Sequence, residues 1–366
     1  MTLPYGVFSG PDGVRRIGVR RDDSVLDLSR AESQELILAG GALQQPTLNV
    51  LMALGRPQWS TIRARIIELA PSLPAVPLTD VELHLPFEVA DYTDFYSSEH
   101  HAINAGKILR PDRPGLLPNW KHLPIGYHGR SGTVVVSGTP IVRPHGQLAP
   151  GEFGPTRRLD IEAEVGFVVG VPGRRISTDD FAEHVFGVVL VNDWSARDIQ
   201  AFEYQPLGPF LGKSFATSIS PWVTPLEALA TLPSPAQDPR PAAYLRPPGD
   251  AFDLRLEVEW NGTRVSSPPF AQMYWTPAQQ LAHLTVNGAS VRTGDLYASG
   301  TVSGEASSEA GSFLELTWNG TQPIKLDDGT TRGFLLDGDT VTISATAPGA
   351  AGDRIDLGSV TGTVCS

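Results

Sequence analysis

The sequence predicts a mainly β protein of the α+β class, with a small barrel-like N-terminal domain and a large, mostly β C-terminal domain. The 366 residues exceed the about 250–300 that one hydrophobic core usually supports, so two domains are expected. Short strand-like segments dominate, helical patterns are few, and the two kinds do not alternate along the chain. This order argues against a doubly wound parallel sheet.

The first domain is expected to span residues 1–85. Short apolar segments separated by Gly-rich turns predict a small β-barrel, and they are residues 5–8, 16–19 and 24–28. Residues 58–70 should form a helix, because Trp59, Ile62 and Ile66 recur at helical spacing. Three prolines between residues 71 and 77 then predict a stiff connector.

The second domain is expected to span residues 86–366. The predicted strands are residues 134–136, 165–169, 185–191, 254–260, 313–318 and 340–344. Hairpin turns are predicted at Asn261-Gly262, Asn319-Gly320 and Asp328-Gly329. The predicted helices are residues 98–105, ended by Gly106, then 178–184 and 276–284. Residues 232–250 carry six prolines and are expected to form a surface loop within this domain.

Composition and absent motifs narrow the class of protein. The net charge of −12 disfavours a nucleic-acid partner, although a local cluster of Arg and Lys could still bind a small anion. Cys365 is the only cysteine, so a reducing, cytoplasmic location without disulfides is expected. No signal peptide or membrane-spanning run is visible, so we expect no membrane partner. The Gly-rich dinucleotide motif, the phosphate-binding loop and the nucleophile elbow are absent from the sequence.

Carboxylates near or within apolar segments are the strongest functional signal. Asp94 lies shortly before His101, Glu162 and Glu164 flank Ala163 in an apolar stretch, and Asp193 follows the apolar run 186–191. Buried carboxylates must be paired, protonated or bound to a cation, and a hard divalent ion satisfies several at once. Strand alternation would place Glu162 and Glu164 on one face. From the residues alone, a solvated strand face with basic neighbours is the alternative.

Several longer motifs resemble the fumarylacetoacetase family, the fumarylacetoacetate hydrolases. They are residues 3–9 (LPYGVFS), 91–98 (DYTDFYSS), 119–120 (NW), 123–130 (LPIGYHGR), 192–200 (NDWSARDIQ), 206–215 (PLGPFLGKSF), 298–301 (ASGT) and 334–339 (FLLDGD). The resemblance covers essentially the whole chain. It implies a small SH3-like barrel followed by a mixed β-sandwich or β-roll domain, assembled as a homodimer. It also implies hydrolysis of 4-fumarylacetoacetate to fumarate and acetoacetate, the last step of tyrosine and phenylalanine catabolism.

The resemblance assigns the catalytic roles. His101 matches the general base, and Glu315 matches the carboxylate that orients it. If residues 313–318 form a strand, Glu315 should face away from Leu314 and Leu316 and toward a site. The groups that match stabilisation of the oxyanion and of the departing carbanion are Arg197, Gln200 and Lys213.

The resemblance also assigns ligands. The positions that match calcium ligands are Asp94, Glu162, Glu164 and Asp193. A second cation, magnesium, would be held by Asp193, Thr217 and Lys213, with Lys213 contributing its backbone carbonyl. The substrate-binding positions are Tyr96, Arg110, Tyr127, Gln200, Tyr204 and Thr301. Without the resemblance, Tyr127 and Tyr204 would be read as packed tyrosines with a hydrogen-bonded hydroxyl, and Arg110 and Lys213 as surface charges.

Two rival interpretations stay open from the sequence. One is another metal-dependent diketone or 2-oxo acid hydrolase, decarboxylase or isomerase of the same superfamily. A decarboxylase or isomerase would use the carboxylates without needing His101 and Glu315. The other is a non-catalytic calcium-binding β protein, which would have no reason to bring His101, Lys213 and Arg110 together.

Overall fold

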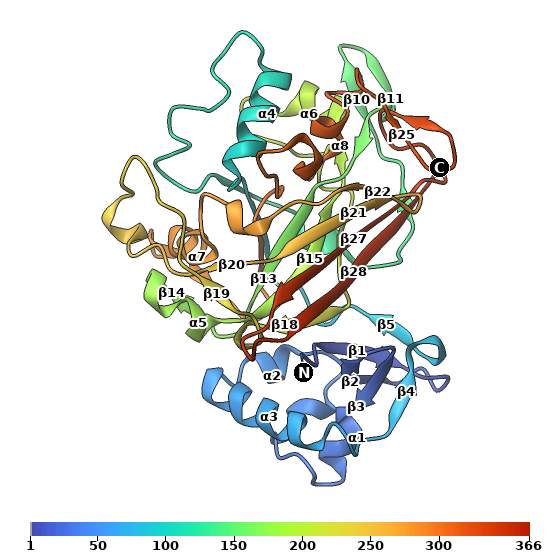
Figure 1. The fold of residues 1–366 in the computed structure, drawn as a ribbon, viewed down its shortest axis with the longest axis vertical. Coiled ribbons are helices and arrows are strands. Elements are labelled where there is room, and N and C mark those ends of the chain that lie inside the picture. Colours follow the sequence, from blue (N-terminus) through green and yellow to red (C-terminus); the bar gives the residue numbers. More distant parts are fainter. Residues whose placement is uncertain (1) are drawn as a thin grey trace.

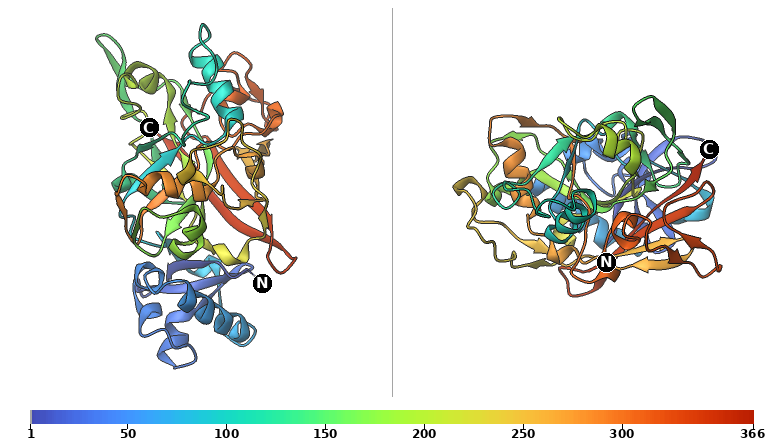
Figure 2. Two further views of the ribbon diagram at one scale, coloured as in Figure 1. Left: turned by 90° about the vertical axis from the view of Figure 1, so that its left-hand side faces the viewer. Right: turned by 90° about the horizontal axis from the view of Figure 1, so that it is seen from above.

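The computed structural model describes residues 2–366, in which the N-terminal region lies at one end of a larger β-rich body (Figures 1 and 2). The N-terminal strands are β1 (Tyr5–Ser9), β2 (Arg15–Arg21), β3 (Ser24–Asp27), β4 (Ala75–Pro77) and β5 (Glu82–His84). The helices are α1 (Leu28–Ser33), α2 (Asn49–Met52) and α3 (Arg56–Leu69). The predicted helix over 58–70 is therefore confirmed as α3, which buries Trp59, Ile62 and Ile66.

The N-terminal sheet continues into the large region. Strand β1 pairs with β2 and β5 and also with β18 (Trp222–Pro225), so that one sheet runs through both regions. The division of the chain at residue 85 stays a prediction. Within the large region, the sheet continues in the order β18-β15-β13-β24-β6-β7, and β17 pairs with both β15 and β8. Three of the carboxylates that the sequence singled out, Asp94, Glu164 and Asp193, lie on these strands.

The strands of this sheet have the following bounds: β6 (Tyr92–Phe95), β7 (Gly126–His128), β8 (Val134–Val136), β13 (Ala163–Val169), β15 (Val185–Asp193), β17 (Thr217–Ile219) and β24 (Leu296–Ala298). Strands β13 and β15 are antiparallel and buried along their whole length. Such runs are apolar because neither face meets water.

A second sheet of the large region has the order β22-β21-β27-β28-β9. Its strands are β9 (Ile141–Val142), β21 (Arg255–Trp260), β22 (Thr263–Ser266), β27 (Thr340–Pro348) and β28 (Arg354–Cys365). Burial alternates along β21 and β27, so each presents one face to the core. That face shares a hydrophobic core with β13 and β15, as in a β-sandwich (Figure 1).

Short elements complete the fold. The helices are α4 (Glu99–Leu109), α5 (Phe181–His184), α6 (Arg197–Glu203), α7 (Pro277–Thr285) and α8 (Phe313–Leu316). The remaining strands are β10 (His145–Ala149), β11 (Glu152–Pro155), β12 (Leu159–Asp160), β14 (Gly173–Arg174), β16 (Ser195–Ala196), β19 (Thr231–Leu232), β20 (Ala251–Phe252), β23 (Ser290–Val291), β25 (Ile324–Lys325) and β26 (Thr331–Arg332). Single 3₁₀ turns cover residues 42–44, 78–80, 131–133, 178–180, 226–228, 243–245, 270–272 and 307–309. Within residues 2–366, no helix has the length and apolar character needed to cross a bilayer.

Three local predictions were wrong, two of which concern a helix and a strand. The helix expected to stop at Gly106 continues to Leu109. Gly106 is needed for close packing instead, because a Cβ there would lie 2.0 Å from the Gly115 carbonyl oxygen. The strand expected over 313–318 is the short helix α8, whose N-cap is Ser312. The apolar alternation misled because Phe313, Leu314 and Glu315 are consecutive and all buried, whereas a strand with one buried face would alternate.

The turn at Asn319-Gly320 was also predicted wrongly as a hairpin. Trp318, Asn319 and Gly320 all have positive φ and continue directly from the end of α8. The other two turns are confirmed, since Asn261-Gly262 joins β21 to β22 and Asp328-Gly329 joins β25 to β26.

Candidate active site

Four buried carboxylates converge at one end of the large sheet. Asp94 lies on β6, Glu164 on β13 and Asp193 at the end of β15, while Glu162 precedes β13. One oxygen from each lies within 4.8 Å of the others. Glu162 and Asp193 exchange two backbone hydrogen bonds of 3.1 Å, which fix their side chains next to each other. The fold therefore brings the four predicted cation ligands together.

Glu162 and Asp193 have basic partners. Lys213 Nζ lies 2.7 Å from Glu162 Oε2 and 2.6 Å from Asp193 Oδ2, and Arg197 Nη1 lies 2.7 Å from Glu162 Oε1. Burial by itself would raise the pKa of Glu162, but the charges of Lys213 and Arg197 outweigh it and lower that pKa. Burial likewise opposes ionisation of Lys213, yet Asp193 and Glu162 raise its pKa. Glu162 and Lys213 are therefore charged at neutral pH.

Asp94 and Glu164 have no comparable partners among the described residues. Both oxygens of Glu164 and Oδ1 of Asp94 are buried without a hydrogen-bond donor, while Asp94 Oδ2 accepts one from the Tyr127 hydroxyl at 2.9 Å. Burial, together with repulsion from the neighbouring carboxylates, raises the pKa of Asp94 and of Glu164. Unpartnered buried oxygens are costly, and a hard divalent cation would satisfy them. The residues present thus fit a metal site.

Beside the cluster lies a buried histidine–glutamate pair. His101 on α4 places Nδ1 2.6 Å from Glu315 Oε2 on α8. Glu315 also accepts hydrogen bonds from Asn104 (3.0 Å), Ser303 (3.0 Å) and Ser312 (2.8 Å). Burial would raise the pKa of Glu315, but the charge of protonated His101 and these hydrogen bonds lower it. Glu315 is therefore an ionised partner that stabilises a positive imidazole.

The pair lies near the carboxylates. With Nδ1 engaged by Glu315, Nε2 is the nitrogen of His101 left for chemistry. His101 is close enough to the cluster for its charge to contribute to lowering the Glu162 pKa. The Tyr96 ring packs edge-on against the imidazole, with 5.4 Å between ring centroids. Glu315 thus lies beside His101 as predicted, although on a helix and not on a strand.

Arg197 and Gln200 lie on the first turn of α6. Arg197 Nη1 donates to Gln200 Oε1 at 3.1 Å, and Arg197 Nε donates to Asp160 Oδ2 at 2.7 Å. The third guanidinium nitrogen, Nη2, is buried without a partner. Asp160 was missed in the sequence, although it precedes Glu162 by two residues in the same apolar segment.

The remaining predicted residues divide into near and distant groups. The Tyr127 hydroxyl oxygen also lies 3.1 Å from Asp193 Oδ2, and Thr217 donates to Asp193 Oδ1 at 3.2 Å. Together with Lys213 and Asp193, Tyr127 lines a cavity of about 120 Å³ beside Asp193. The Lys213 side chain is an ion-pair partner in this structure, and a role for its carbonyl toward magnesium stays a prediction.

For Arg110, Thr301 and Tyr204, the structure gives less direct evidence of a position near the carboxylates. Arg110 ends α4, its Nε is buried without a partner, and its charge opposes the rise that burial produces in the pKa of Tyr96. Thr301 is buried, and its hydroxyl lacks a partner. Tyr204, at the end of α6, accepts a hydrogen bond from the adjacent Gln205 at 2.9 Å. Within residues 2–366 no hydrogen bond or ion pair joins Tyr204 to the carboxylates.

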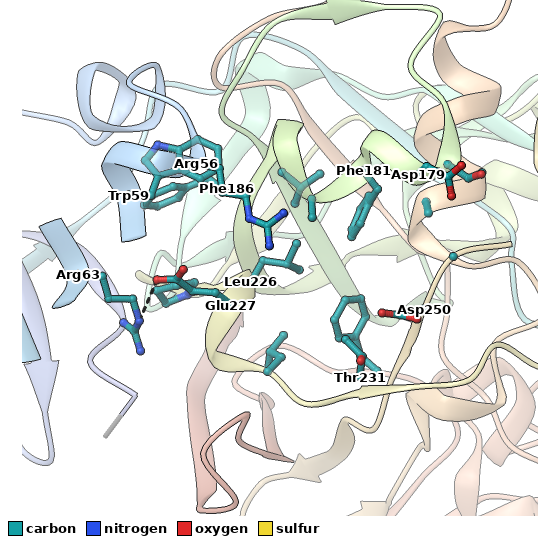
Figure 3. A pocket seen from close by; sticks show the side chains of 18 of the residues that line it. Arg56, Trp59, Arg63, Asp179, Phe181, Phe186, Leu226, Glu227, Thr231 and Asp250 are labelled. Atoms are coloured by element: carbon teal, nitrogen blue, oxygen red, sulfur yellow. Dashed lines mark ion pairs between the residues drawn. The ribbon is translucent and has the colours of Figure 1, made fainter. Parts of the chain in front are cut away.

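A separate cavity of about 350 Å³ lies where α3 meets the large region (Figure 3). Its walls include Trp59, Phe181, Phe186 and Leu226, with Arg56 at one side. It contains none of the predicted site residues. The cavity beside Asp193 is smaller, but three of the predicted site residues, Tyr127, Asp193 and Lys213, line it.

Comparison with known proteins agrees with this geometry. The family model "Fumarylacetoacetase N-terminal" matches residues 1–86, and "Fumarylacetoacetate (FAA) hydrolase C-terminal" matches residues 91–365. The chain is 47% identical to fumarylacetoacetase of Homo sapiens, over 99% of this chain and 94% of that protein. It is 44% identical to fumarylacetoacetase of Caenorhabditis elegans, over 99% and 95% of the two chains. It is 42% identical to that of Arabidopsis thaliana, over 99% and 94%.

Solved structures show the same fold at lower identity. A fumarylacetoacetate hydrolase from Exiguobacterium antarcticum aligns with a TM-score of 0.61 and 18% identity, over 100% of this chain and 99% of that one. Maleylpyruvate hydrolase from Sphingobium sp. SYK-6 aligns with a TM-score of 0.59 and 16% identity, over 99% of each chain. These two likenesses concern the fold alone, whereas the family models cover both regions of the sequence. The chain belongs to the fumarylacetoacetate hydrolase family.

Proposed function

We propose that this protein is a fumarylacetoacetase, which hydrolyses the carbon–carbon bond of 4-fumarylacetoacetate to give fumarate and acetoacetate. The observation that carries the proposal is the buried His101–Glu315 pair beside four carboxylates, in a chain whose full-length relatives are fumarylacetoacetases. A calcium-binding protein without activity has no use for a buried histidine held by an ionised glutamate. A decarboxylase that relies on a cation alone has no use for it either.

In the proposed reaction, His101 acts as general base. Nε2 takes a proton from water. Glu315, which is hydrogen-bonded to Nδ1, stabilises the imidazolium that results. The water oxygen bonds to the carbonyl carbon next to the fumaryl double bond. The carbon–carbon bond then breaks, its electron pair leaves with acetoacetate as an enolate, and a proton from His101 or solvent completes the product.

Charged donors of the chain stabilise the negative charge that develops. Arg197 is held at two of its nitrogens and keeps buried Nη2 as a free donor, which supports a role toward the oxyanion. Lys213, charged because it lies between Glu162 and Asp193, and the Gln200 amide would act on the oxyanion and the leaving carbanion. These donors are fixed before substrate binds, so little reorganisation is needed in the transition state.

A divalent cation belongs to the same proposal. Asp94, Glu162, Glu164 and Asp193 would hold Ca²⁺, and Asp193, Thr217 and the Lys213 carbonyl would hold Mg²⁺. The bound cation would supply Lewis acidity toward the diketone oxygens. The unpartnered oxygens of Glu164 and Asp94 support the first site, and the Thr217–Asp193 contact supports the second.

The substrate is a diketo acid with two carboxylates. Arg110 would bind one carboxylate, which its buried, unpartnered Nε supports. Hydroxyls and an amide around the cluster would bind the rest of the molecule, and they belong to Tyr96, Tyr127, Gln200, Tyr204 and Thr301. Tyr204 would have to exchange its Gln205 contact for the substrate.

We also propose that the protein is a cytoplasmic homodimer. A single cysteine at position 365 is consistent with a reducing compartment. Sedimentation at micromolar concentration should give the mass of two chains, and a stable monomer would contradict the dimer.

The test of the activity is a spectrophotometric assay for loss of fumarylacetoacetate, with and without a chelator, in which the products are identified. We expect equal amounts of fumarate and acetoacetate, formed only when a divalent cation is present. Release of carbon dioxide, or isomerisation without cleavage, would favour the superfamily alternatives. Cation binding without any turnover would favour the non-catalytic one.

A further inference from the structure

We propose that Asp160 is a positioning residue. Its carboxylate holds Arg197 and, through helix α8, Glu315 at fixed positions relative to each other. The inference rests on the proposed function and adds to it a carboxylate that touches neither a bound cation nor substrate. It would explain how Arg197, on the oxyanion side of the site, and Glu315, on the base side, keep a fixed separation. The observations that carry it are the four hydrogen bonds that converge on this side chain.

Asp160 ends β12, and its side chain is fully buried. Oδ1 accepts from the backbone N–H groups of Ile161 and Phe313, both at 2.7 Å. Oδ2 accepts from Leu314 N–H at 3.0 Å and from Arg197 Nε at 2.7 Å. Four donors require an acceptor-only side chain, so an ionised carboxylate matches this site and a protonated acid does not.

The first link runs to the base. Phe313 and Leu314 are the first two residues of α8, and Glu315 is the third. The helix has only four residues, so it contributes little stability of its own. Without Asp160, two buried N–H groups would lose their acceptor, and the turn that presents Glu315 to His101 would lose an anchor.

The second link runs to the oxyanion side. Asp160 engages Arg197 at Nε, while Glu162 and Gln200 engage it at Nη1. A planar guanidinium held at these two nitrogens cannot rotate, so Nη2 becomes the donor that remains for the reaction. In Asp160→Asn, at least one N–H group of the side-chain amide would face another N–H donor. The guanidinium plane of Arg197 would then be held less firmly.

Asp160→Asn tests the proposal, and Glu32→Gln is the matched control. Glu32 is also a buried carboxylate that accepts three backbone N–H groups, from Ala39, Gly41 and Leu43, but it lies in the N-terminal region. Both variants should lower the thermal midpoint. Asp160→Asn should also lower kcat about 10²–10³-fold, the usual cost of a lost oxyanion donor, with KM changed less than about threefold. Glu32→Gln should keep kcat within twofold.

A second measurement does not depend on activity. Backbone hydrogen exchange at Phe313, Leu314 and Glu315 should accelerate in Asp160→Asn and stay unchanged in Glu32→Gln. If wild type exchanges as expected but never cleaves fumarylacetoacetate, the proposed function fails while the anchoring by Asp160 stands. Unchanged exchange at these residues, or a kcat of Asp160→Asn within twofold of wild type, would overturn the positioning role.

Discussion

The two ends of the site hold buried carboxylates in opposite surroundings. At the base end, Glu315 receives hydrogen bonds from His101, Asn104, Ser303 and Ser312. At the cation end, defined by Asp94 and Glu164, three carboxylate oxygens have no donor in the part of the chain that the structure describes. The pKa of Glu315 is lowered, whereas the pKa values of Asp94 and Glu164 are raised.

The difference lies in the hydrogen-bond partners. Those of Glu315 come from the chain itself, whereas the unpartnered oxygens of Asp94 and Glu164 would gain a partner from a bound cation. The base end is preorganised, because a fully bonded carboxylate fixes the imidazole before substrate arrives. The cation end stores unfavourable charge, which a divalent ion would relieve. Substitutions at the two ends should therefore change activity and stability in different ways.

The largest effect is expected at the cation end. Glu164→Ala or Asp193→Ala should abolish activity and remove the stabilisation that calcium gives. In the wild type that stabilisation should reach about 2.7 kcal/mol when the free ion is 100 times its Kd. Thermal unfolding with and without calcium measures it. Glu164→Gln in chelator should be no less stable than wild type, because it removes a buried carboxyl group whose oxygens lack partners and whose ionisation is unfavourable. Near-normal turnover of Glu164→Ala without calcium would show that the metal assignment is wrong.

At the base end, His101→Ala should lower turnover by about 10²–10⁴, the usual contribution of general-base catalysis. Calcium stabilisation and substrate affinity should persist, since the four cation ligands are intact. The rate of fumarate release from pH 5 to 9 measures the effect. Wild-type-like rates in this variant would exclude water activation by His101.

Between the two ends, Arg110 tests how the substrate is held. Arg110→Met should cost about 1.5–3 kcal/mol of charge-assisted bonding and appear mainly as a higher KM. Arg264→Met, at an arginine whose side chain is 64% exposed, is the control and should leave KM unchanged. Equal KM values for the two variants would place Arg110 outside the pocket.

The smallest effect is expected for Glu315→Gln, which keeps the shape of the base end and removes its charge. Protonated His101 then loses its counter-charge, so the acidic limb of the pH–rate profile should move to lower pH. No movement of the limb would mean that Glu315 does not act on His101.

Stability should follow the lowered pKa of Glu315. A carboxylate with a lowered folded-state pKa stabilises the fold above its ordinary value of 4.5, and the contribution is lost as pH falls through the lowered value. The stability that the ionised Glu315 contributes relative to Glu315→Gln should thus be present at neutral pH and shrink below about pH 4.5. Urea unfolding across this range measures it.

Local sequence patterns were sufficient for part of this protein. Helix α3 was predictable because Trp59, Ile62 and Ile66 repeat at the helical period over a long segment. The buried strand around Glu164 and the run leading to Asp193 were predictable because long apolar segments have few alternatives. The cation ligands could be suspected for the same reason, since charges in apolar strands need partners.

Other features were decided only by tertiary contacts. Glu315 was expected on a strand and lies on α8, whose first N–H groups are held by Asp160, more than 150 residues earlier. Asn104 and Ser303 reach the same carboxylate from two other segments. Sequence periodicity reflects neighbours within a few residues along the chain. It can predict which side chains are buried, but not which distant residues contact them. The partners that make a buried charge stable come from distant segments, and only the folded chain determines which carboxylates are satisfied and which still need a cation.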